Sequence, residues 1–384
     1  MNISFNIEPI IFILAGISFA FATFFIIWEY INLRSLKKCI QKSEANNNNN
    51  TEGVSVIIYA DNDTENLGKN LIHFLEQDYP NYEVIVVNDG ANEATKDLLE
   101  SWECRYDNLR LTYTPDDAKN LSRKKLAIMI GIKAAQNDII ITTNGNCVPA
   151  SNQWISSIAK HFSNGADVVL GHVKYDLKSA FNNFLFHQDA VKHLTYALRH
   201  KPYRGTSENL AYRKSLFFKN KGFSRSMHLH YGEDDLFVNE IASKRNTSVE
   251  IAPNSIISVD MPHPDYSFTS TKLRRAFTER MIHSFAFPLF TIKSLLPLLS
   301  IVAIIISIAF AYTNLIVIGF AILLFLLATT LHLLIIRKTS LLLQTKCSLA
   351  LIPIFAIAQP FTELYYNLKS RRHTTYNYTW QPLK

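Results

Sequence analysis

The acidic run Gly-Glu-Asp-Asp-Leu at 232–236 is the strongest candidate for acid–base chemistry in this chain. A hydroxyl that attacks an electrophilic carbon must lose a proton, and a carboxylate within hydrogen-bond reach can accept it. We predict that Asp234 is this base, with the adjacent Asp235 as the alternative, and that repulsion from Glu233 and Asp235 raises the pKa of Asp234. The run also suits a structural role, because acidic residues are favoured at the start of a helix.

Three predicted strands end in side chains that could bind a nucleotide and a sugar. The strands are short, β-branched apolar runs, and each is followed by apolar residues at helical spacing. The side chains that follow the strands are Asp61 and Asp63 after 54–60, Asp89 after 83–87, and Asn144 and Asn146 after 139–143. Alternating strands and helices predict an α/β fold with a doubly wound sheet, whose ligands bind at the carboxyl ends of the strands. These side chains could therefore hold a nucleotide diphosphate, its metal ion and a sugar.

Several common catalytic motifs are missing from the sequence. It contains no Walker A sequence, GxGxxG, GxSxG or HExxH, which are the usual signatures of P-loop NTPases, dinucleotide enzymes, serine hydrolases and zinc proteases. Its four cysteines form no CxxC pair and show no Cys/His ligand spacing. A zinc site and a disulfide framework are therefore not expected, and the cysteine content is consistent with a reducing compartment.

Seven segments between residues 54 and 285 together resemble, in order, a family 2 glycosyltransferase of the GT-A fold, of the membrane-anchored and processive-synthase-like kind. These segments are 54–63, 83–90, 124–127, 140–149, 209–223, 232–236 and 272–277. The resemblance implies a Rossmann-like nucleotide-diphospho-sugar transferase domain. It also implies an inverting transfer of a sugar, from a UDP-sugar donor to a lipid-linked or growing glycan acceptor.

The resemblance also implies roles for individual residues. Nucleotide binding is expected of four side chains: Asp63, Asp89, Lys124 and Asn144. In this set Asp89 would accept a hydrogen bond from the uracil N3–H, although an aspartate before a glycine also suits a turn. Contact with the diphosphate or the acceptor is expected of three arginines: Arg204, Arg274 and Arg275. An alternative for Arg275 is a role at the membrane surface, since 272–280 is a basic, amphipathic stretch.

The sequence departs from the family at the metal-binding DxD position, which here reads Asn144-Gly-Asn146. Amide oxygens of Asn144 and Asn146 can ligate a hard cation, but they bring no negative charge to the site. A divalent metal, Mn²⁺ or Mg²⁺, is therefore expected to be weakly held or absent, and basic side chains could neutralise the diphosphate instead. The alternative is a catalytically silent pseudo-glycosyltransferase that binds a nucleotide or glycan or serves as a synthase subunit.

The composition predicts a membrane protein with a soluble middle. Charged residues make up 18% of the chain, and none occurs in 9–28 or 294–336, runs long enough to cross a bilayer. We expect five regions: a transmembrane anchor at 1–33, a polar linker at 34–53, a GT-A domain at 54–285, two transmembrane helices at 286–338, and a C-terminal region at 339–384. In the last region, the apolar stretch 347–362 is expected to be interfacial or re-entrant, before a basic tail.

The distribution of basic residues predicts the orientation. Arg34, Lys37 and Lys38 follow the first span, whereas residues 1–8 contain no basic side chain. The positive-inside rule then places the catalytic domain in the cytoplasm. With the resemblance to a glycosyltransferase, the expected location is a bacterial inner membrane. A net charge of +7 suits an anionic lipid surface or a phosphorylated substrate, and nucleic acid is not an expected partner. A transporter is disfavoured because the spans lack ionisable residues; cell-envelope polysaccharide synthesis, with possible synthase partners, is the expected setting.

Overall fold

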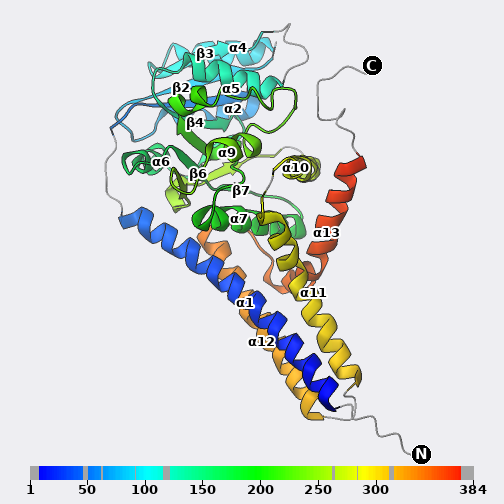
Figure 1. The fold of residues 1–384 in the computed structure, drawn as a ribbon. Coiled ribbons are helices and arrows are strands. Elements are labelled where there is room, and N and C mark those ends of the chain that lie inside the picture. The colour runs from blue at the N-terminus through cyan, green and yellow to red at the C-terminus, as the bar shows by residue number, and fades with distance from the viewer. Residues whose placement is uncertain are drawn as a thin grey trace, which may run out of the picture.

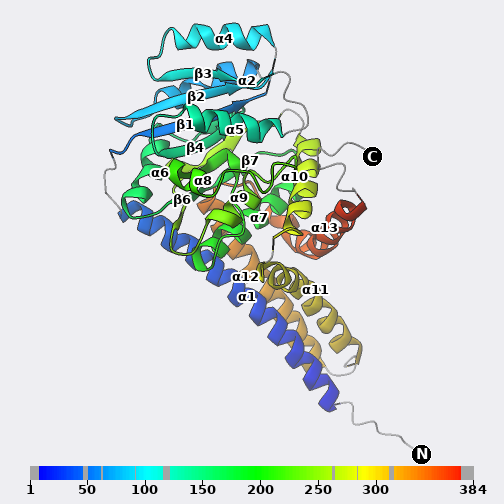
Figure 2. The same cartoon turned by 45° about the horizontal axis from the view of Figure 1, so that its top comes forward.

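The computed structural model of this chain describes residues 8–45, 51–61, 64–90, 92–115, 122–261, 264–282, 284–310 and 315–372. An α/β part lies at one end of the molecule, and three long helices extend from it side by side (Figure 1). They are α1 (Glu8–Ala45), α11 (Ala286–Phe310) and α12 (Leu315–Leu342). A fourth long helix, α13 (Ile352–Arg372), lies beside the α/β part instead of continuing along this bundle, as Figure 2 also shows.

A seven-stranded sheet with the order β3-β2-β1-β4-β8-β6-β9 forms the centre of the α/β part. Its strands are β1 (Val54–Ala60), β2 (Tyr82–Asn88), β3 (Leu109–Tyr113), β4 (Ile139–Asn144), β6 (Val168–Gly171), β8 (Leu210–Arg213) and β9 (Thr247–Glu250). The first four strands pair in parallel, whereas β8 runs antiparallel to both of its neighbours. The predicted α/β architecture is confirmed, with a sheet that is mixed instead of wholly parallel.

A second, three-stranded sheet has the order β5-β10-β7. Its strands are β5 (Cys147–Pro149), β7 (Val173–Tyr175) and β10 (Ile257–Val259). Strand β5 begins just after the Asn144-Gly-Asn146 turn and pairs antiparallel with β10. The first strand of the small sheet therefore follows the carboxyl end of β4 directly in the chain.

Helices cover both faces of the central sheet. They are α2 (Thr64–Asn70), α3 (Ile72–Leu75), α4 (Glu93–Glu103), α5 (Arg123–Ala134), α6 (Trp154–Ser163), α7 (Ala180–Arg199), α8 (Lys214–Lys219), α9 (Asp235–Ile241) and α10 (Pro264–Glu279). Alternate residues of β1 pack on opposite faces: Ile57 belongs to one buried cluster, whereas Val56 and Ile58 belong to another. This period of two is the direct result of the pleat, and it gives the sheet an apolar core on each side.

The polar linker expected at 34–53 is wrong for its first part, because α1 continues without a break to Ala45. A helix of this length spans about 57 Å, whereas a bilayer core is about 30 Å thick. The second half of α1 packs on the α/β part: Leu36 is fully buried, and Cys39 Sγ lies 3.2 Å from the carbonyl oxygen of Val249. At the end of the helix, Ser43 donates a hydrogen bond of 2.6 Å to Glu250.

Four helices in the described part of the chain are long and apolar enough to cross a membrane. They fall in 13–45, 286–310, 315–342 and 349–371, so they include the two helices expected between 286 and 338. The stretch 347–362, expected to be interfacial or re-entrant, continues as helix α13 to Arg372. Side chains on one face of α13 are exposed, among them Ile354, Phe361 and Leu364. Whether this helix lies in the interface stays a prediction.

Candidate active site

The acidic run at 232–236 lies where α9 begins, and its three carboxylates point to different partners. Asp234 caps α9, because its Oδ1 accepts a hydrogen bond of 2.9 Å from the backbone N–H of Asp235. Asp235 accepts a bond from the hydroxyl of Thr278 on α10 and is fully enclosed. Glu233 is buried, and neither of its carboxylate oxygens has a hydrogen-bond partner among the described residues. Asp234 therefore serves both as the N-cap of α9 and as a member of the acidic site.

Two basic side chains lie against these acids. Lys124 Nζ is 3.5 Å from Glu233 Oε1, and Arg274 Nη1 is 3.7 Å from the same oxygen. Arg274 Nη2 lies 3.5 Å from Asp234 Oδ2. Lys124 also donates a 2.8 Å hydrogen bond to the hydroxyl of Ser207. A buried pair of carboxylates is thus balanced by two cations that come from α5 and α10, more than a hundred residues apart in the sequence.

The electrostatics of the two aspartates differ from the sequence expectation. Burial alone would raise the pKa of Asp234, but the charges of Arg274 and Lys124 outweigh it and lower that pKa. The predicted upward shift for Asp234 is therefore wrong. Burial and repulsion from Asp234 instead raise the pKa of Asp235, to about 6. Asp234 is consequently the more acidic member of the pair and is the first to ionise as the pH rises.

Asp89 lies at the carboxyl end of β2 within a set of hydrogen-bond donors. Its Oδ2 accepts a bond of 2.9 Å from the hydroxyl of Tyr59, and its Oδ1 accepts from Thr114 and from Arg123 Nε. Arg123 also forms an ion pair with Asp89. Each carboxylate oxygen has two lone pairs, so Asp89 keeps capacity for a further donor such as an imide N–H. These bonds fix the carboxylate in place.

The Asn144-Gly-Asn146 turn does not fit a tightly held divalent cation. Asn144 Oδ1 is buried with no hydrogen-bond partner among the described residues, so it can accept from a ligand or ligate a cation. Asn146 instead donates through Nδ2 to the carbonyl oxygen of Asp260, at 2.8 Å. Within the described ranges, no group of three His, Cys, Asp or Glu side chains could hold a metal ion. Two amides without a carboxylate give such an ion no compensating charge.

The three candidate arginines separate into two places. Arg274 faces the acidic run, whereas Arg204 and Arg275 both pair with Asp189 on α7. Arg204 Nη2 lies 3.0 Å from Asp189 Oδ2, and Arg275 Nη1 bonds to the same oxygen. The sequence did not separate Arg274 from Arg275, because which face of α10 packs inward depends on the tertiary contacts of that helix. Asp63, the last candidate for nucleotide binding, lies outside the described residues.

Two basic residues next to Lys124 have roles that the sequence reasoning missed. Arg123 positions Asp89, as described above. Lys125 is fully buried, and its Nζ donates to the carbonyl oxygens of Ser226 and, at 2.7 Å, Tyr231. Burial lowers the pKa of Lys125 to about 8, and the bonds fix the loop that leads into the acidic run. In the sequence, the run of three basic residues at 123–125, at the start of a predicted helix, was the pattern that could have indicated these roles.

Comparison with known proteins places this site in a family context. Residues 55–229 match the profile of Glycosyl transferase family 2, and the acidic run begins a few residues after this match ends. A curated relative, Glycosyltransferase AglE from Haloferax volcanii, is 30% identical over 125 residues. That alignment covers 32% of this chain and 40% of the relative, so the chain matches less than half of the relative's length.

Solved structures with a similar arrangement were also found. One is the mannosyltransferase PcManGT from Pyrobaculum calidifontis in complex with GDP-Man and Mn²⁺, at 16% identity and a TM-score of 0.49, covering 91% of this chain and 99% of that one. Another is S. aureus TarS 1–349 in complex with UDP-GlcNAc, at 14% identity and a TM-score of 0.41, covering 85% of this chain and 91% of that one.

The family match includes β1, β2 and β4 and the polar side chains at their carboxyl ends, and it extends through β8. The resemblance inferred from the motifs is thereby confirmed over residues 55–229. Residues 55–229 of this chain form a family 2 glycosyltransferase domain within a GT-A-like α/β fold.

Proposed function

We propose that this chain transfers a sugar, with inversion, from a UDP-sugar to a lipid-linked acceptor at the cytoplasmic face of the membrane. The observation that carries the proposal is the ionised, buried Asp234 held between the start of α9 and Arg274. A carboxylate in that position can take the proton of an attacking hydroxyl. The neighbouring Lys124 and Arg274 supply positive charge where a leaving group would develop negative charge.

The transfer proceeds in one displacement. The acceptor oxygen forms a bond to the anomeric carbon as the bond from that carbon to the diphosphate oxygen breaks, which inverts the configuration. Asp234 receives the acceptor proton, and the diphosphate leaves with the electron pair of the broken bond. Lys124 and Arg274 stabilise that charge electrostatically, and no step in this scheme passes through a metal ion.

The choice of a uridine nucleotide rests on Asp89. Tyr59, Thr114 and Arg123 fix its carboxylate at the end of β2, which β1 separates from β4 in the sheet. A fixed carboxylate with a free lone pair matches the N3–H of uracil, which is a hydrogen-bond donor. Asn144, whose buried Oδ1 has no partner among the described residues, offers a second acceptor for the donor substrate.

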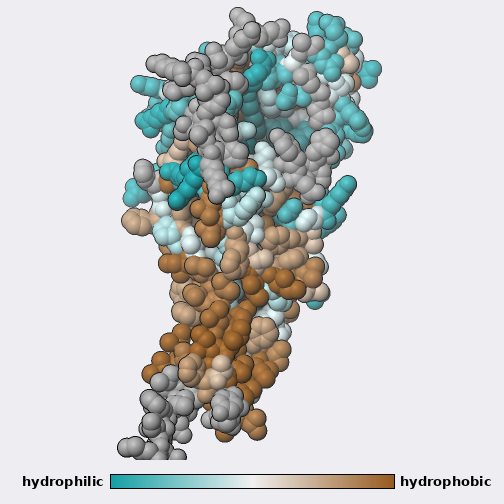
Figure 3. Space-filling model, turned by 90° about the vertical axis from the view of Figure 1, so that its right-hand side faces the viewer, coloured by the Kyte–Doolittle hydropathy of each residue, from teal (hydrophilic) through white to brown (hydrophobic). Residues whose placement is uncertain are grey.

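The membrane setting rests on the distribution of apolar surface. Figure 3 shows a continuous hydrophobic zone below the polar α/β part, on the side of the molecule where α11 and α13 lie. Large apolar side chains on α11 and α12 are exposed, among them Ile305, Leu323 and Leu326. A soluble protein rarely leaves so much apolar surface uncovered. The basic residues after the first span support a cytoplasmic position for the α/β domain.

The test is release of the nucleoside diphosphate by the purified full chain, UDP from a panel of UDP-sugars and GDP from GDP-mannose, with a membrane extract as the acceptor source. We expect donor-specific release that falls at least about a hundredfold in Asp234→Asn, the range typical of a lost general base. Asp97→Asn, which alters an exposed aspartate on α4, is the matched control and should turn over normally.

The outcomes separate the alternatives. Turnover with GDP-mannose alone would overturn the uridine assignment while keeping the transferase. Equal turnover in Asp234→Asn would overturn the base assignment. No turnover with any donor, despite measurable nucleotide binding, would favour the catalytically silent binder raised by the Asn144-Gly-Asn146 turn.

A further inference from the structure

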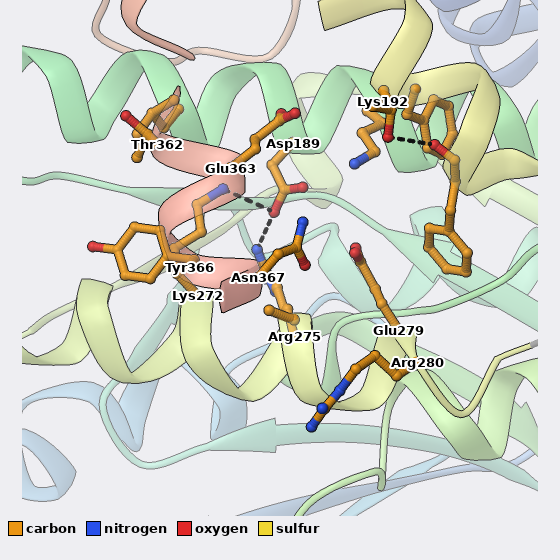
Figure 4. A pocket seen from close by; sticks show the side chains of 15 residues that line it. Asp189, Lys192, Lys272, Arg275, Glu279, Arg280, Thr362, Glu363, Tyr366 and Asn367 are labelled. Carbon is orange, nitrogen blue, oxygen red and sulfur yellow. Dashed lines mark hydrogen bonds and ion pairs between the residues drawn. The ribbon is translucent and has the colours of Figure 1, made fainter. Parts of the chain in front are cut away.

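A cavity of about 210 Å³ lies where α7, α10, α11 and α13 meet. Figure 4 shows basic side chains from α7 and α10, and polar ones from α13, arranged around it. Its basic residues are Lys192, Lys272, Arg275 and Arg280. The aromatic residues Phe287 and Phe290, at the start of α11, form part of its wall. The cavity therefore sits at the boundary between the α/β part and the apolar helices.

The charges around this cavity favour an anion. Three acidic residues, Asp189, Glu279 and Glu363, also line it, but Asp189 is already paired with Arg275 and with Arg204 behind it. Four basic side chains line the cavity against three acidic ones, and Arg204 adds a further positive charge behind Asp189. In the described part of the chain, Lys192 has no carboxylate oxygen within ion-pair distance, and its Nζ lies 4.6 Å from the ring centroid of Phe290. Four basic side chains gathered around one cavity, one of them without a directly bonded carboxylate, favour binding of an anion.

A second cavity, of about 80 Å³, lies further down the helix bundle and is mainly apolar. One face of α11 and one face of α13 line both cavities. On each helix a residue of the upper cavity is seven positions from a residue of the lower one, and residues seven apart lie on the same side of a helix. On α11 the pair is Phe290 above and Pro297 below; on α13 it is Glu363 above and Ala356 below. We call this shared contact the α11–α13 seam. It joins a cationic site at the membrane boundary to an apolar site among the membrane helices.

The cationic cavity and the catalytic acids lie on adjacent faces of α10. Consecutive helical residues point about 100° apart, and here Arg274 faces Glu233 and Asp234 whereas Arg275 faces Asp189. An anion in the cavity is therefore beside the base and not in contact with it. A reacting hydroxyl would have to be carried on a group attached to that anion.

We propose that the α11–α13 seam binds the acceptor as a lipid-phosphate-linked saccharide. The phosphate lies among Lys192, Lys272, Arg275 and Arg280, the hydrocarbon chain follows the seam into the apolar cavity, and the attached sugar extends past α10 to Asp234. This assignment rests on the proposed glycosyl transfer and specifies its acceptor class.

The experiment uses farnesyl phosphate as the probe and native mass spectrometry of the full chain released from detergent. We expect one bound farnesyl phosphate per chain and at least about tenfold weaker binding in Lys192→Gln, since a charge-assisted contact is lost. Lys192→Arg should restore binding, and Lys219→Gln, which removes an exposed charge on α8, should leave it unchanged. Ala356→Phe, which fills the apolar cavity, should weaken binding with the cationic site intact. Farnesol should bind at least about tenfold more weakly than farnesyl phosphate.

Two further readouts separate this inference from the proposed function. UDP affinity should be the same in Lys192→Gln and in the unaltered chain, whereas the KM for a lipid-linked saccharide acceptor should rise. Equal farnesyl phosphate binding in Lys192→Gln and the unaltered chain would overturn the seam assignment, whatever the donor turnover. Transfer of sugar onto farnesyl phosphate itself would overturn the saccharide assignment. If lipid binding depends on Lys192 but no donor is turned over, the result would contradict the proposed transferase activity and leave the proposed lipid site standing.

Discussion

Asp234 and Asp235 are neighbours in the sequence, but the structure gives them opposite environments. Asp234 faces Arg274 and Lys124, which keep its pKa low. Asp235 turns toward Thr278, and burial and the charge of Asp234 outweigh the charge of Arg274 and raise its pKa to about 6. One aspartate is thus available as a base, whereas the other is a buried structural group that is costly to ionise.

The raised pKa of Asp235 predicts a dependence of stability on pH. The folded chain holds this proton up to about pH 6, whereas the unfolded chain loses it near pH 3.8, so the free energy of unfolding falls as pH rises between these values. Because an asparagine cannot ionise, Asp235→Asn should remove this fall in the free energy of unfolding. We expect the variant to be more stable than the unaltered chain at pH 8 by about 1–3 kcal/mol, and to show little difference at pH 4. Thermal unfolding in detergent measures it, with Asp97→Asn as control; an identical pH dependence in Asp235→Asn would contradict the assignment.

The amide pair at 144 and 146 predicts weak dependence on metal. Lys124 and Arg274 already place positive charge beside the acids, and two amides attract a divalent ion poorly. Donor turnover should therefore fall less than about tenfold in EDTA, whereas the double variant Asn144→Asp, Asn146→Asp should gain a dependence on Mn²⁺. UDP release with and without EDTA measures both. Complete loss in EDTA with recovery in Mn²⁺, in the unaltered chain, would show that a metal is essential.

Among the elements, α1 has a role beyond anchoring. Its second half packs into the same buried cluster as β6, β8 and β9, with Leu36 at the centre of the contact. At its end, Glu250 joins Ser43 to Lys160 and His161. Burial would raise the pKa of Glu250, but His161 and Lys160 outweigh it and lower that pKa to about 2. The helix is therefore a rigid connection between membrane and catalytic domain.

This contact predicts that Leu36 is a core residue of the catalytic domain. Leu36→Ala should destabilise the domain by about 2–5 kcal/mol, because it leaves a cavity in a packed interior. Hydrogen exchange of the amides in 34–45 should rise with it. Ile31→Ala, at a more exposed site of the same helix, is the matched control and should change neither quantity appreciably. Fast exchange of 34–45 in the unaltered chain would indicate a flexible linker after all.

On the scale of the whole molecule, the polar domain and the apolar bundle occupy opposite ends (Figure 3). The ion pair between Glu29 and Lys293, at 2.6 Å, joins α1 to α11 close to the level where the two parts meet. Both side chains are buried, so removal of one partner would leave an uncompensated charge. The pair thereby fixes the two helices relative to each other beside the α/β domain.

The proposed orientation can be tested with a native cysteine. Cys104 is exposed on the α/β domain, whereas Cys39 and Cys147 are buried. A membrane-impermeant maleimide should therefore label Cys104 in inverted membrane vesicles and not in intact cells, because the basic residues after the first span place this domain inside. Cys104→Ser identifies the labelled site. Labelling of Cys104 in intact cells would place the catalytic domain outside.

The sequence by itself determined the local elements and the order of the motifs. Strand β1 and its neighbours were predictable because β-branched runs followed by helical spacing are local patterns. The apolar helices were predictable because a run without charges needs only length to cross a bilayer. The acidic run and Asp89 were predictable as candidates, since their residue types and their places after strands already limit the chemistry.

Only the tertiary structure decided which of these residues act together. Arg274 and Arg275 are adjacent in the sequence, yet the rotation of α10 sends the first to Asp234 and the second to Asp189. The docking of Leu36 depends on strands more than a hundred residues away, so a window around 34–53 could not reveal it. Side-chain direction and charge pairing arise from packing between distant elements, and packing of that kind has no local pattern to read.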